Sequence, residues 1–287
     1  MSDGNANGPL AAFSVDVEDY FQVEALKEYC PRSRWEACED RTVANTERLL
    51  LLLERHRSRG TFFVLGWTAK RHPELVKRIS EAGHEIASHG YHHELVYNQT
   101  PDEFRQDVGD ARRLLQDLSG QAVLGYRAPS YTVVHRTQWA LPILAEQGHS
   151  YDSSIFPIKR MRYGMPNAPR WPYRIELGDG RTLAEFPLPT VRLGGINVPA
   201  TGGAYLRLLP FPLQTWAVAR MIRSHRPFVL TIHPWELDPG QPQFPVPPFT
   251  RWTHYHNLGV AQTRLEAFLA KTPFRPQAEI LSDLKLL

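Results

Sequence analysis

Strand-like and helix-like segments alternate along most of this chain, and this alternation restricts its fold more than any other feature. Strands are expected over residues 11–17, 61–66 and 84–88, and a strand followed by a loop is expected within each of 122–131 and 227–236. Residues 142–155 are expected to hold the end of a helix, a Gly turn and another strand. The segments expected to form helices are residues 42–60, 72–83, 100–120 and 213–225. Polar residues recur where the strands end. The pattern predicts an α/β fold, either a β/α barrel or an open parallel sheet, with a site at the carboxyl edge of the strands.

The helix predicted over residues 100–120 has the clearest boundaries. Thr100 can cap its first turn, Pro101 suits the first helical position, and Glu103 completes a capping box. Residues 160–210 interrupt the alternation because they are rich in Pro, Gly and Arg, so irregular strands and loops are expected there. A last helix is expected around residues 263–271.

The bulk composition excludes several classes of protein. With 287 residues, 42% of them hydrophobic, the chain can bury a full core. Its formal charge of +3 comes without blocks of Lys or Arg, so no nucleic-acid partner is expected. No apolar run approaches the length of a membrane span. The N-terminus lacks a secretory signal, which predicts a cytoplasmic protein if this N-terminus is the natural one.

Histidines gather in the stretch HEIASHGYHH, residues 84–93, which holds four of the 12 in the chain. His89 and His93 lie four residues apart, and neutral imidazoles at this spacing can face one ion. A catalytic zinc site needs three protein ligands, often two His and one carboxylate. His84 and His89 lie five apart and outside a helix, so the stretch does not fit the HExxH signature of zinc proteases. His89 and His93 are therefore candidate metal ligands.

Further chemically versatile residues lie at the ends of other predicted strands. Asp16, Glu18 and Asp19 lie at the end of the first strand. Three neighbouring carboxylates repel one another, so we expect a positive charge close by that offsets this repulsion. Arg127 follows the strand within residues 122–131, and its planar fork suits a carboxylate. Asp152 and His233 end two later strands. The carboxyl ends of parallel strands share one edge, so these side chains are expected to form a single site.

Taken together, these motifs resemble the polysaccharide deacetylases of carbohydrate esterase family 4, the NodB-homology family. The family's motifs stand here, in the same order, as DVEDY, HGYHH, RAPSY, YDSSIF and LTIHP. The resemblance covers residues 11–236, after a flexible N-terminus of residues 1–10. The stretches FSVDVEDYFQVEAL, HPWELDP and RWTHYHNL resemble more narrowly the deacetylases of bacterial exopolysaccharide clusters linked to exosortase systems. In that subgroup residues 237–287 would be a C-terminal extension packed on the same domain.

The resemblance implies a distorted (β/α)7 barrel that removes N-acetyl groups from N-acetylated saccharides. It implies a divalent metal, usually zinc, held by one Asp together with His89 and His93. A carboxylate would act as the base and be held by Arg127, and His233 would protonate the sugar amine as the general acid. Tyr131, Asp152 and Trp235 are the expected substrate-binding residues.

One departure from the family leaves the acidic residues ambiguous. The family has two adjacent Asp, the first as base and the second as metal ligand, whereas this chain has Asp16-Val17-Glu18-Asp19. Alignment on the last two residues favours Asp19 as the ligand. The period of two in a strand instead places Asp16 and Glu18 on one face. We therefore favour Asp19 as the ligand and leave the base open between Asp16 and Glu18.

Two other functions compete with saccharide deacetylation. The chain could hydrolyse a non-sugar amide, as the allantoinase-like members of the superfamily do, or it could be an inactive carbohydrate-binding barrel. The set of acids, the His pair, Arg127 and His233 argues against an inactive barrel, because binding alone needs no acid opposite a metal. The sequence predicts neither the polymer nor the oligomeric state.

Overall fold

The computed structural model of the chain describes residues 10–160 and 162–287. Of the N-terminal segment predicted to be flexible, residues 1–10, only Leu10 is described. The described strands form an eight-stranded sheet in the order β10-β1-β2-β3-β4-β5-β7-β6 and a separate β8–β9 hairpin. The strands are β1 (Ala11–Val17), β2 (Thr61–Val64), β3 (Glu85–Ser88), β4 (Gly125–Tyr126), β5 (Tyr151–Asp152), β6 (Tyr173–Glu176), β7 (Thr182–Glu185), β8 (Thr190–Leu193), β9 (Ile196–Pro199) and β10 (Phe228–Ile232).

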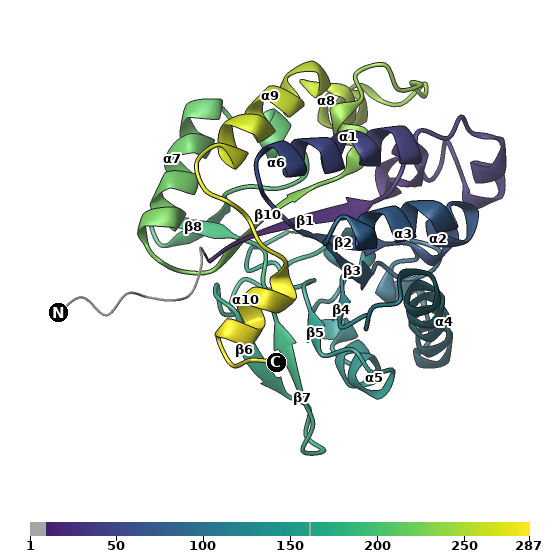
Figure 1. The fold of residues 1–287 in the computed structure, drawn as a ribbon, viewed down its shortest axis with the longest axis vertical. Coiled ribbons are helices and arrows are strands. Elements are labelled where there is room, and N and C mark those ends of the chain that lie inside the picture. The colour runs from purple at the N-terminus through teal and green to yellow at the C-terminus, as the bar shows by residue number, and fades with distance from the viewer. Residues whose placement is uncertain (1–9, 161) are drawn as a thin grey trace.

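The predicted α/β fold is confirmed. In the large sheet every neighbouring pair is parallel except β6 and β7, so seven of its eight described strands run parallel. The sheet curls, and helices cover its outer face (Figure 1). Its hydrogen-bonded order is open, with β10 and β6 at the two edges. The expected barrel is therefore a curled sheet with two free edges.

The described helices are α1 (Thr42–Arg55), α2 (Gly66–Arg71), α3 (Pro73–Glu81), α4 (Pro101–Ser119), α5 (Ala140–Glu146), α6 (Ala204–Leu208), α7 (Phe211–Arg223), α8 (Pro248–Tyr255), α9 (Leu258–Leu269) and α10 (Gln277–Asp283). Of these, α1, α3, α4, α5, α7 and α9 overlap the predicted helical segments, whereas α2, α6, α8 and α10 lie outside them. The capping box predicted at Thr100 and Glu103 is confirmed, with the Thr100 N–H donating to the Glu103 carboxylate at 2.7 Å. The helix predicted over 42–60 ends earlier, at Arg55, because the chain then turns into β2.

Side chains of β1 alternate between two environments. Phe13, Val15 and Val17 belong to the large apolar cluster between the sheet and its helices. Ala12 belongs to a different cluster inside the curled sheet, and Ser14 bonds to Thr231 of β10 at 2.9 Å. Because side chains in a strand alternate with a period of two, the inward row continues from Ser14 to Asp16 at the end of the strand.

The C-terminal helix α10 packs against the sheet. Its Ile280 and Leu281 belong to the inner apolar cluster with Ala12. The Gln277 N–H donates to Thr61 Oγ1 at 2.8 Å, at the first residue of β2. These contacts attach the end of the chain to the amino-terminal end of the strands, away from Asp16. The predicted division between residues 236 and 237 stays a prediction.

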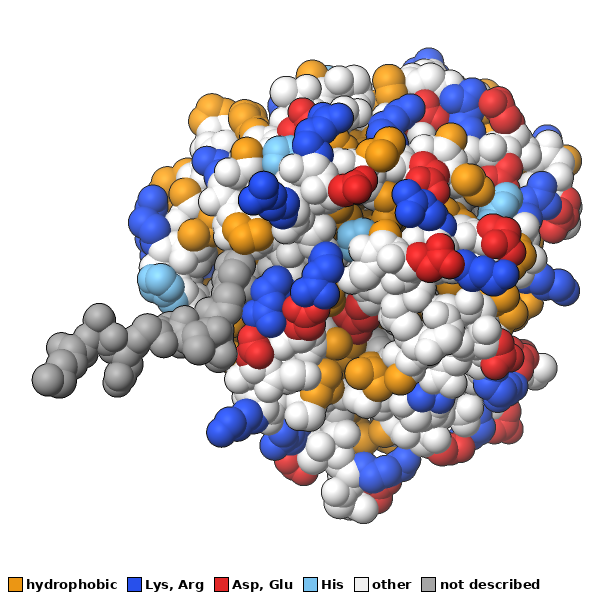
Figure 2. All heavy atoms as spheres, in the orientation of Figure 1, with side chains coloured by type: hydrophobic (Ala, Val, Ile, Leu, Met, Phe, Trp, Pro, Cys, Tyr) orange, Lys and Arg blue, Asp and Glu red, His pale blue; other side chains and the backbone are white. Residues whose placement is uncertain are grey.

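The surface mixes charges of both signs. Over the face drawn in Figure 2, Lys and Arg side chains lie interspersed with Asp and Glu. Among the described helices, none combines the length and the apolar character that crossing a membrane requires.

Candidate active site

Glu18, His89 and His93 converge just beyond the carboxyl ends of β1 and β3. The Glu18 Oε1 atom lies 3.0 Å from His89 Nε2 and 3.1 Å from His93 Nε2. All three residues are buried, and their ligand atoms lie within 4.8 Å of one another. A carboxylate oxygen and two imidazole nitrogens are the donor set that zinc accepts from proteins. This arrangement fits a divalent metal.

The orientation of His89 strengthens this fit. Its Nδ1 lies 2.8 Å from the Arg127 carbonyl oxygen, which can only accept, so Nδ1 carries the proton and donates it. In the neutral ring the Nε2 lone pair then faces Glu18, and two acceptors face each other. A cation between them removes that conflict, and an outer hydrogen bond of this kind commonly orients metal-binding His.

His93 is held under backbone strain. Its φ is +55°, in the left-handed region that L-residues with a side chain rarely adopt. Burial disfavours the charged imidazole, but the charge and hydrogen bond of Glu18 outweigh it and raise the pKa of His93. Strained backbone of this kind is characteristic of functional sites.

Asp19, the predicted metal ligand, does not face the two His in this structure. The Asp19 carboxylate points to the other side of the chain, where it accepts from the Arg41 N–H at 2.6 Å, the Tyr20 N–H at 2.8 Å and the Thr42 hydroxyl at 3.1 Å. It thereby connects the end of β1 to the start of α1. Burial raises the pKa of Asp19 to about 6, although these donors favour the charged form. Glu18, directly after β1, faces the two His instead, and Asp16 of β1 lies beside it.

Asp16 and Arg127 form a fully buried ion pair beside this cluster. Arg127 Nη1 donates to Asp16 Oδ1 at 2.6 Å, and neither side chain is more than 2% exposed. Ser14 and Ser153 occupy other donors of the guanidinium, whose plane lies over the ring of Phe63 at 4.1 Å. With Oδ1 held in this way, Asp16 Oδ2 remains directed towards Tyr131 and His233.

His233 lies opposite Asp16. Its Nε2 is 3.8 Å from Asp16 Oδ2 and 3.9 Å from Glu18 Oε1. Its Nδ1 is 3.0 Å from Glu236, which accepts in turn from Arg207 Nε at 2.8 Å. Burial would lower the pKa of His233, but the hydrogen bond that its Nδ1–H donates to Glu236 and the nearby carboxylates raise it to about 9. His233 is therefore ready to donate a proton at neutral pH.

Sequence reasoning missed Glu236 and Arg207. The Glu236 side chain is fully buried, and burial opposes its charge, but Arg207 and His233 hold its pKa at about 2. The spacing of His233 and Glu236, three residues apart after a strand, is that of a capping box and offered a signal for Glu236. Arg207 gave no such signal, because it lies on α6, 29 residues earlier in the chain.

A cavity of about 250 Å³ opens onto these residues. Asp16, Glu18, His93 and His233 line it, together with the predicted substrate-binding residues Tyr131 and Trp235. The Tyr131 hydroxyl lies 3.5 Å from Asp16 Oδ2. Ring stacking places Trp235 beside His233, with 5.5 Å between the ring centroids.

Asp152, predicted to bind substrate, lies beneath the cavity and not in its lining. Asp152 is fully buried, does not line the cavity, and accepts from the Ser154 hydroxyl at 2.5 Å. The Ser154 oxygen accepts in turn from the Ala128 N–H at 2.7 Å. Asp152 therefore supports the loop that carries Arg127, because β5 ends beneath that loop.

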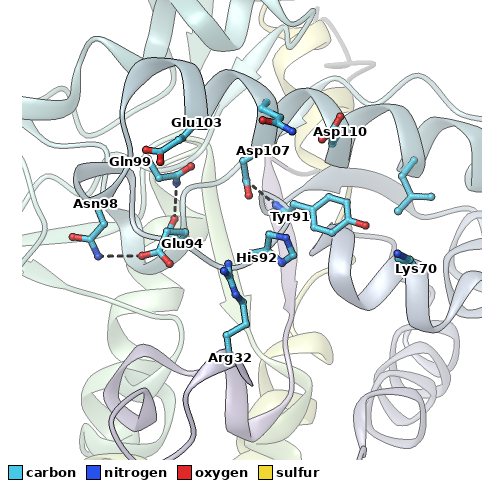
Figure 3. Close-up of a pocket in the computed structure, with 12 residues that line it drawn as sticks. Arg32, Lys70, Tyr91, His92, Glu94, Asn98, Gln99, Glu103, Asp107 and Asp110 are labelled. Atoms are coloured by element: carbon cyan, nitrogen blue, oxygen red, sulfur yellow. Dashed lines mark hydrogen bonds between the residues drawn. The ribbon is translucent and has the colours of Figure 1, made fainter. Parts of the chain in front are cut away.

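A larger cavity, of about 920 Å³, lies on the other side of the segment that carries the two His. Figure 3 shows His92 and Tyr91 lining it, opposite residues of α4. Asp107 of α4 accepts from the Tyr91 N–H at 2.8 Å. Gly90, with φ of +76°, permits this approach, since a Cβ there would lie 2.8 Å from the Asp107 carboxylate. His92 thus lines this cavity and not the one beside Asp16, Glu18 and His233.

Two segments of the chain match known family models, and part of it matches curated proteins. Residues 35–149 match a family model described as polysaccharide deacetylase, and residues 153–282 match a domain of unknown function, DUF3473. A peptidoglycan-N-acetylglucosamine deacetylase of Bacillus cereus is 33% identical over 96 residues, which are 33% of this chain and 35% of that protein. The chain thus spans about a third of the length of this curated relative.

Solved structures extend the likeness to almost the whole chain. A crystal structure from Mycobacterium smegmatis, assigned to a polysaccharide deacetylase, has a TM-score of 0.63 at 25% identity and covers 98% of this chain and 92% of its own. Puue allantoinase has a TM-score of 0.61 at 16% identity, covering 97% and 93%, and shows the fold alone. In its fold, and in sequence over residues 35–149, the chain is similar to the polysaccharide deacetylases.

Proposed function

We propose that the protein is a metal-dependent hydrolase that removes N-acetyl groups from N-acetylated amino sugars of a bacterial polysaccharide or its precursor. One observation carries the proposal. Asp16 and His233, a candidate base and a candidate acid, both lie beside the site formed by Glu18, His89 and His93, with His233 Nε2 3.8 Å from Asp16 Oδ2 and 3.9 Å from Glu18 Oε1. The name of the Bacillus cereus relative, which specifies N-acetylglucosamine, supports the substrate class.

In this proposal Glu18, His89 and His93 would hold the metal, for which zinc is the natural candidate. When bound, it would supply a Lewis acid and a water of lowered pKa. Asp16 accepts the proton of the attacking water at Oδ2. Arg127 donates a hydrogen bond to Oδ1 and stabilises the negative charge of the carboxylate. His233 donates its Nε2 proton to the departing sugar amine, and Glu236 stabilises the imidazolium until then. The products are acetate and a free amino sugar.

Acetate release from N-acetylglucosamine oligomers tests the proposal. The purified chain loaded with zinc should release acetate, lose activity after treatment with a chelator, and recover when zinc is restored. Allantoin, assayed in parallel, should remain intact. Hydrolysis of allantoin without acetate release, or saccharide binding without any hydrolysis, would reject deacetylation in favour of one of the two competing functions.

Glu236→Gln should narrow the pH range of activity from the alkaline side. The substitution removes the neighbour whose hydrogen bond and charge help hold the pKa of His233 at about 9. Because the general acid must be protonated, the alkaline limb of the kcat/KM profile should move to lower pH, with a loss of roughly fivefold to tenfold at pH 9. An unchanged alkaline limb in a folded variant would show that Glu236 does not act through His233.

We also propose that the substrate is an exopolysaccharide, or its precursor, whose synthesis is linked to an exosortase system. Residues 237–287 would then be the C-terminal extension of the exosortase-linked deacetylases. We further propose that the protein acts in the cytoplasm. The stretches FSVDVEDYFQVEAL and HPWELDP support the link to an exosortase system by their resemblance to those deacetylases. The test is to compare activity on exopolysaccharides produced by such clusters with activity on peptidoglycan. This comparison distinguishes the two substrate sources.

A further inference from the structure

A separate cavity of about 390 Å³ is lined by five arginines. They are Arg170 before β6, Arg192 on β8, Arg220 and Arg223 on α7, and Arg226 before β10. No described carboxylate lines this cavity, and it shares no lining residue with the cavity at the candidate active site. Arg226 precedes the first residue of β10, whereas His233 follows its last, so the two cavities lie towards opposite ends of that strand.

The ion pairs among the described residues leave these five arginines out. Within residues 10–160 and 162–287, none of the five forms an ion pair with Asp or Glu, although many other arginines of the chain do. Burial, followed by the positive charges of Arg192, Arg220 and Arg226, lowers the pKa of Arg170. Repulsion among the guanidiniums is therefore uncompensated by the described residues, and an anion would relieve it.

Part of this cluster is ordered by its neighbours. The guanidinium carbons of Arg170 and Arg226 each lie 5.1 Å from the ring centroid of Trp171. Arg170 Nε also donates to the Thr190 hydroxyl at 2.8 Å. Two of the guanidiniums are thus held in place before any ligand arrives, which reduces the entropy that binding must overcome.

The negative end of a helix does not account for the cluster. Arg220 and Arg223 lie in the last turn of α7, where the helix terminus carries about half a negative charge. That charge could favour these two arginines, but the other three come from outside α7. Five positive charges also exceed what half a charge can offset.

We propose that this cavity binds a phosphate-containing anion with two or more negative charges, such as pyrophosphate or a phosphorylated sugar. A carboxylate offers two oxygens in one plane and satisfies one guanidinium fork. Phosphate oxygens point in several directions and can accept from arginines that arrive from four different segments of the chain. This binding site is distinct from the proposed deacetylase site and does not depend on that function.

Titration calorimetry with inorganic pyrophosphate in a phosphate-free buffer of low ionic strength tests the proposal. The intact chain should bind one equivalent, and the affinity should fall as salt is added. Arg192→Ala and Arg226→Ala should each weaken binding about tenfold or more, the effect of losing one charge-assisted hydrogen bond. Arg57→Ala, at another exposed arginine without a described ion pair, should leave the affinity unchanged.

Two further experiments show where pyrophosphate binds and whether the natural phosphate belongs to a lipid or to a soluble ligand. Binding should persist in Glu18→Gln, which separates this cavity from a metal that could itself attract pyrophosphate. Cosedimentation with phosphatidylglycerol vesicles that Arg192→Ala abolishes would assign the phosphate to a lipid headgroup, and its absence would assign a soluble ligand. The proposal would be overturned if the intact chain did not bind pyrophosphate, or if it bound citrate more tightly. It would also be overturned if Glu18→Gln lost pyrophosphate binding, or if Arg57→Ala weakened it as much as Arg192→Ala does.

Discussion

Glu18→Gln should abolish tight metal binding and, with it, deacetylation. The amide keeps the size of the side chain but removes the charge that lies 3.0 and 3.1 Å from the two His nitrogens. A zinc site with three protein ligands that loses one of them should lose more affinity than the roughly 10–100-fold that removal of an outer hydrogen-bonding partner costs. Metal content by mass spectrometry and acetate release measure the two effects.

Asp19→Asn is the matched control, because it removes the same charge one residue further along. Asp19 accepts hydrogen bonds from Arg41, Tyr20 and Thr42 and does not face the two His. The variant should bind metal as the unmodified chain does, while its free energy of unfolding falls by about 1–3 kcal/mol, the cost of an impaired buried hydrogen-bonding group. Normal metal binding by Glu18→Gln together with loss in Asp19→Asn would restore Asp19 as the ligand.

Asp16→Asn should retain the metal and lower kcat by roughly 10²–10⁴-fold, the contribution of a positioned general base. It should also lower the free energy of unfolding by about 3–5 kcal/mol, because it leaves the buried Arg127 without its charged partner. Kinetics therefore have to be measured well below the melting temperature of the variant, with folding followed by circular dichroism.

Arg127→Lys provides the comparison for this experiment. Lysine keeps the positive charge beside Asp16 but loses the planar fork that also contacts Ser14 and Ser153. We expect kcat to fall while the metal stays, because the base is present but no longer held. A folded, metal-loaded Asp16→Asn variant with nearly normal kcat would exclude Asp16 as the base.

Local sequence patterns were sufficient to predict most of the secondary structure. The strand of residues 11–17 and the capped helix of residues 101–119 depend on neighbouring side chains, on apolar periodicity and on a capping box. These signals act over a few residues, so they can be recognised without the rest of the fold. The order of the motifs along the chain likewise predicted that His89, His93, Arg127 and His233 lie near one another, as they do in the structure.

The acidic motif shows where such local reasoning stops. Asp16, Glu18 and Asp19 have similar chemistry, and which of them faces the two His depends on where β1 ends and how the chain leaves it. The Glu18 N–H donates to the Asp16 carbonyl at 2.9 Å, in a tight turn at Val17, and the next residues turn towards α1. Asp19 faces away because the start of α1 offers it three donors there.

The sequence by itself determined the alternation of strands and helices and the residues at the strand ends, because both follow from short-range periodicity. Only the tertiary structure decided that Glu18 replaces Asp19 beside the two His, that Asp152 lies beneath the site, and that Arg207 and Glu236 support His233. It likewise brought five arginines from four segments to one cavity. The physical reason is that these contacts join residues far apart in the chain, and the packing of the curled sheet, which no local pattern encodes, sets their distances.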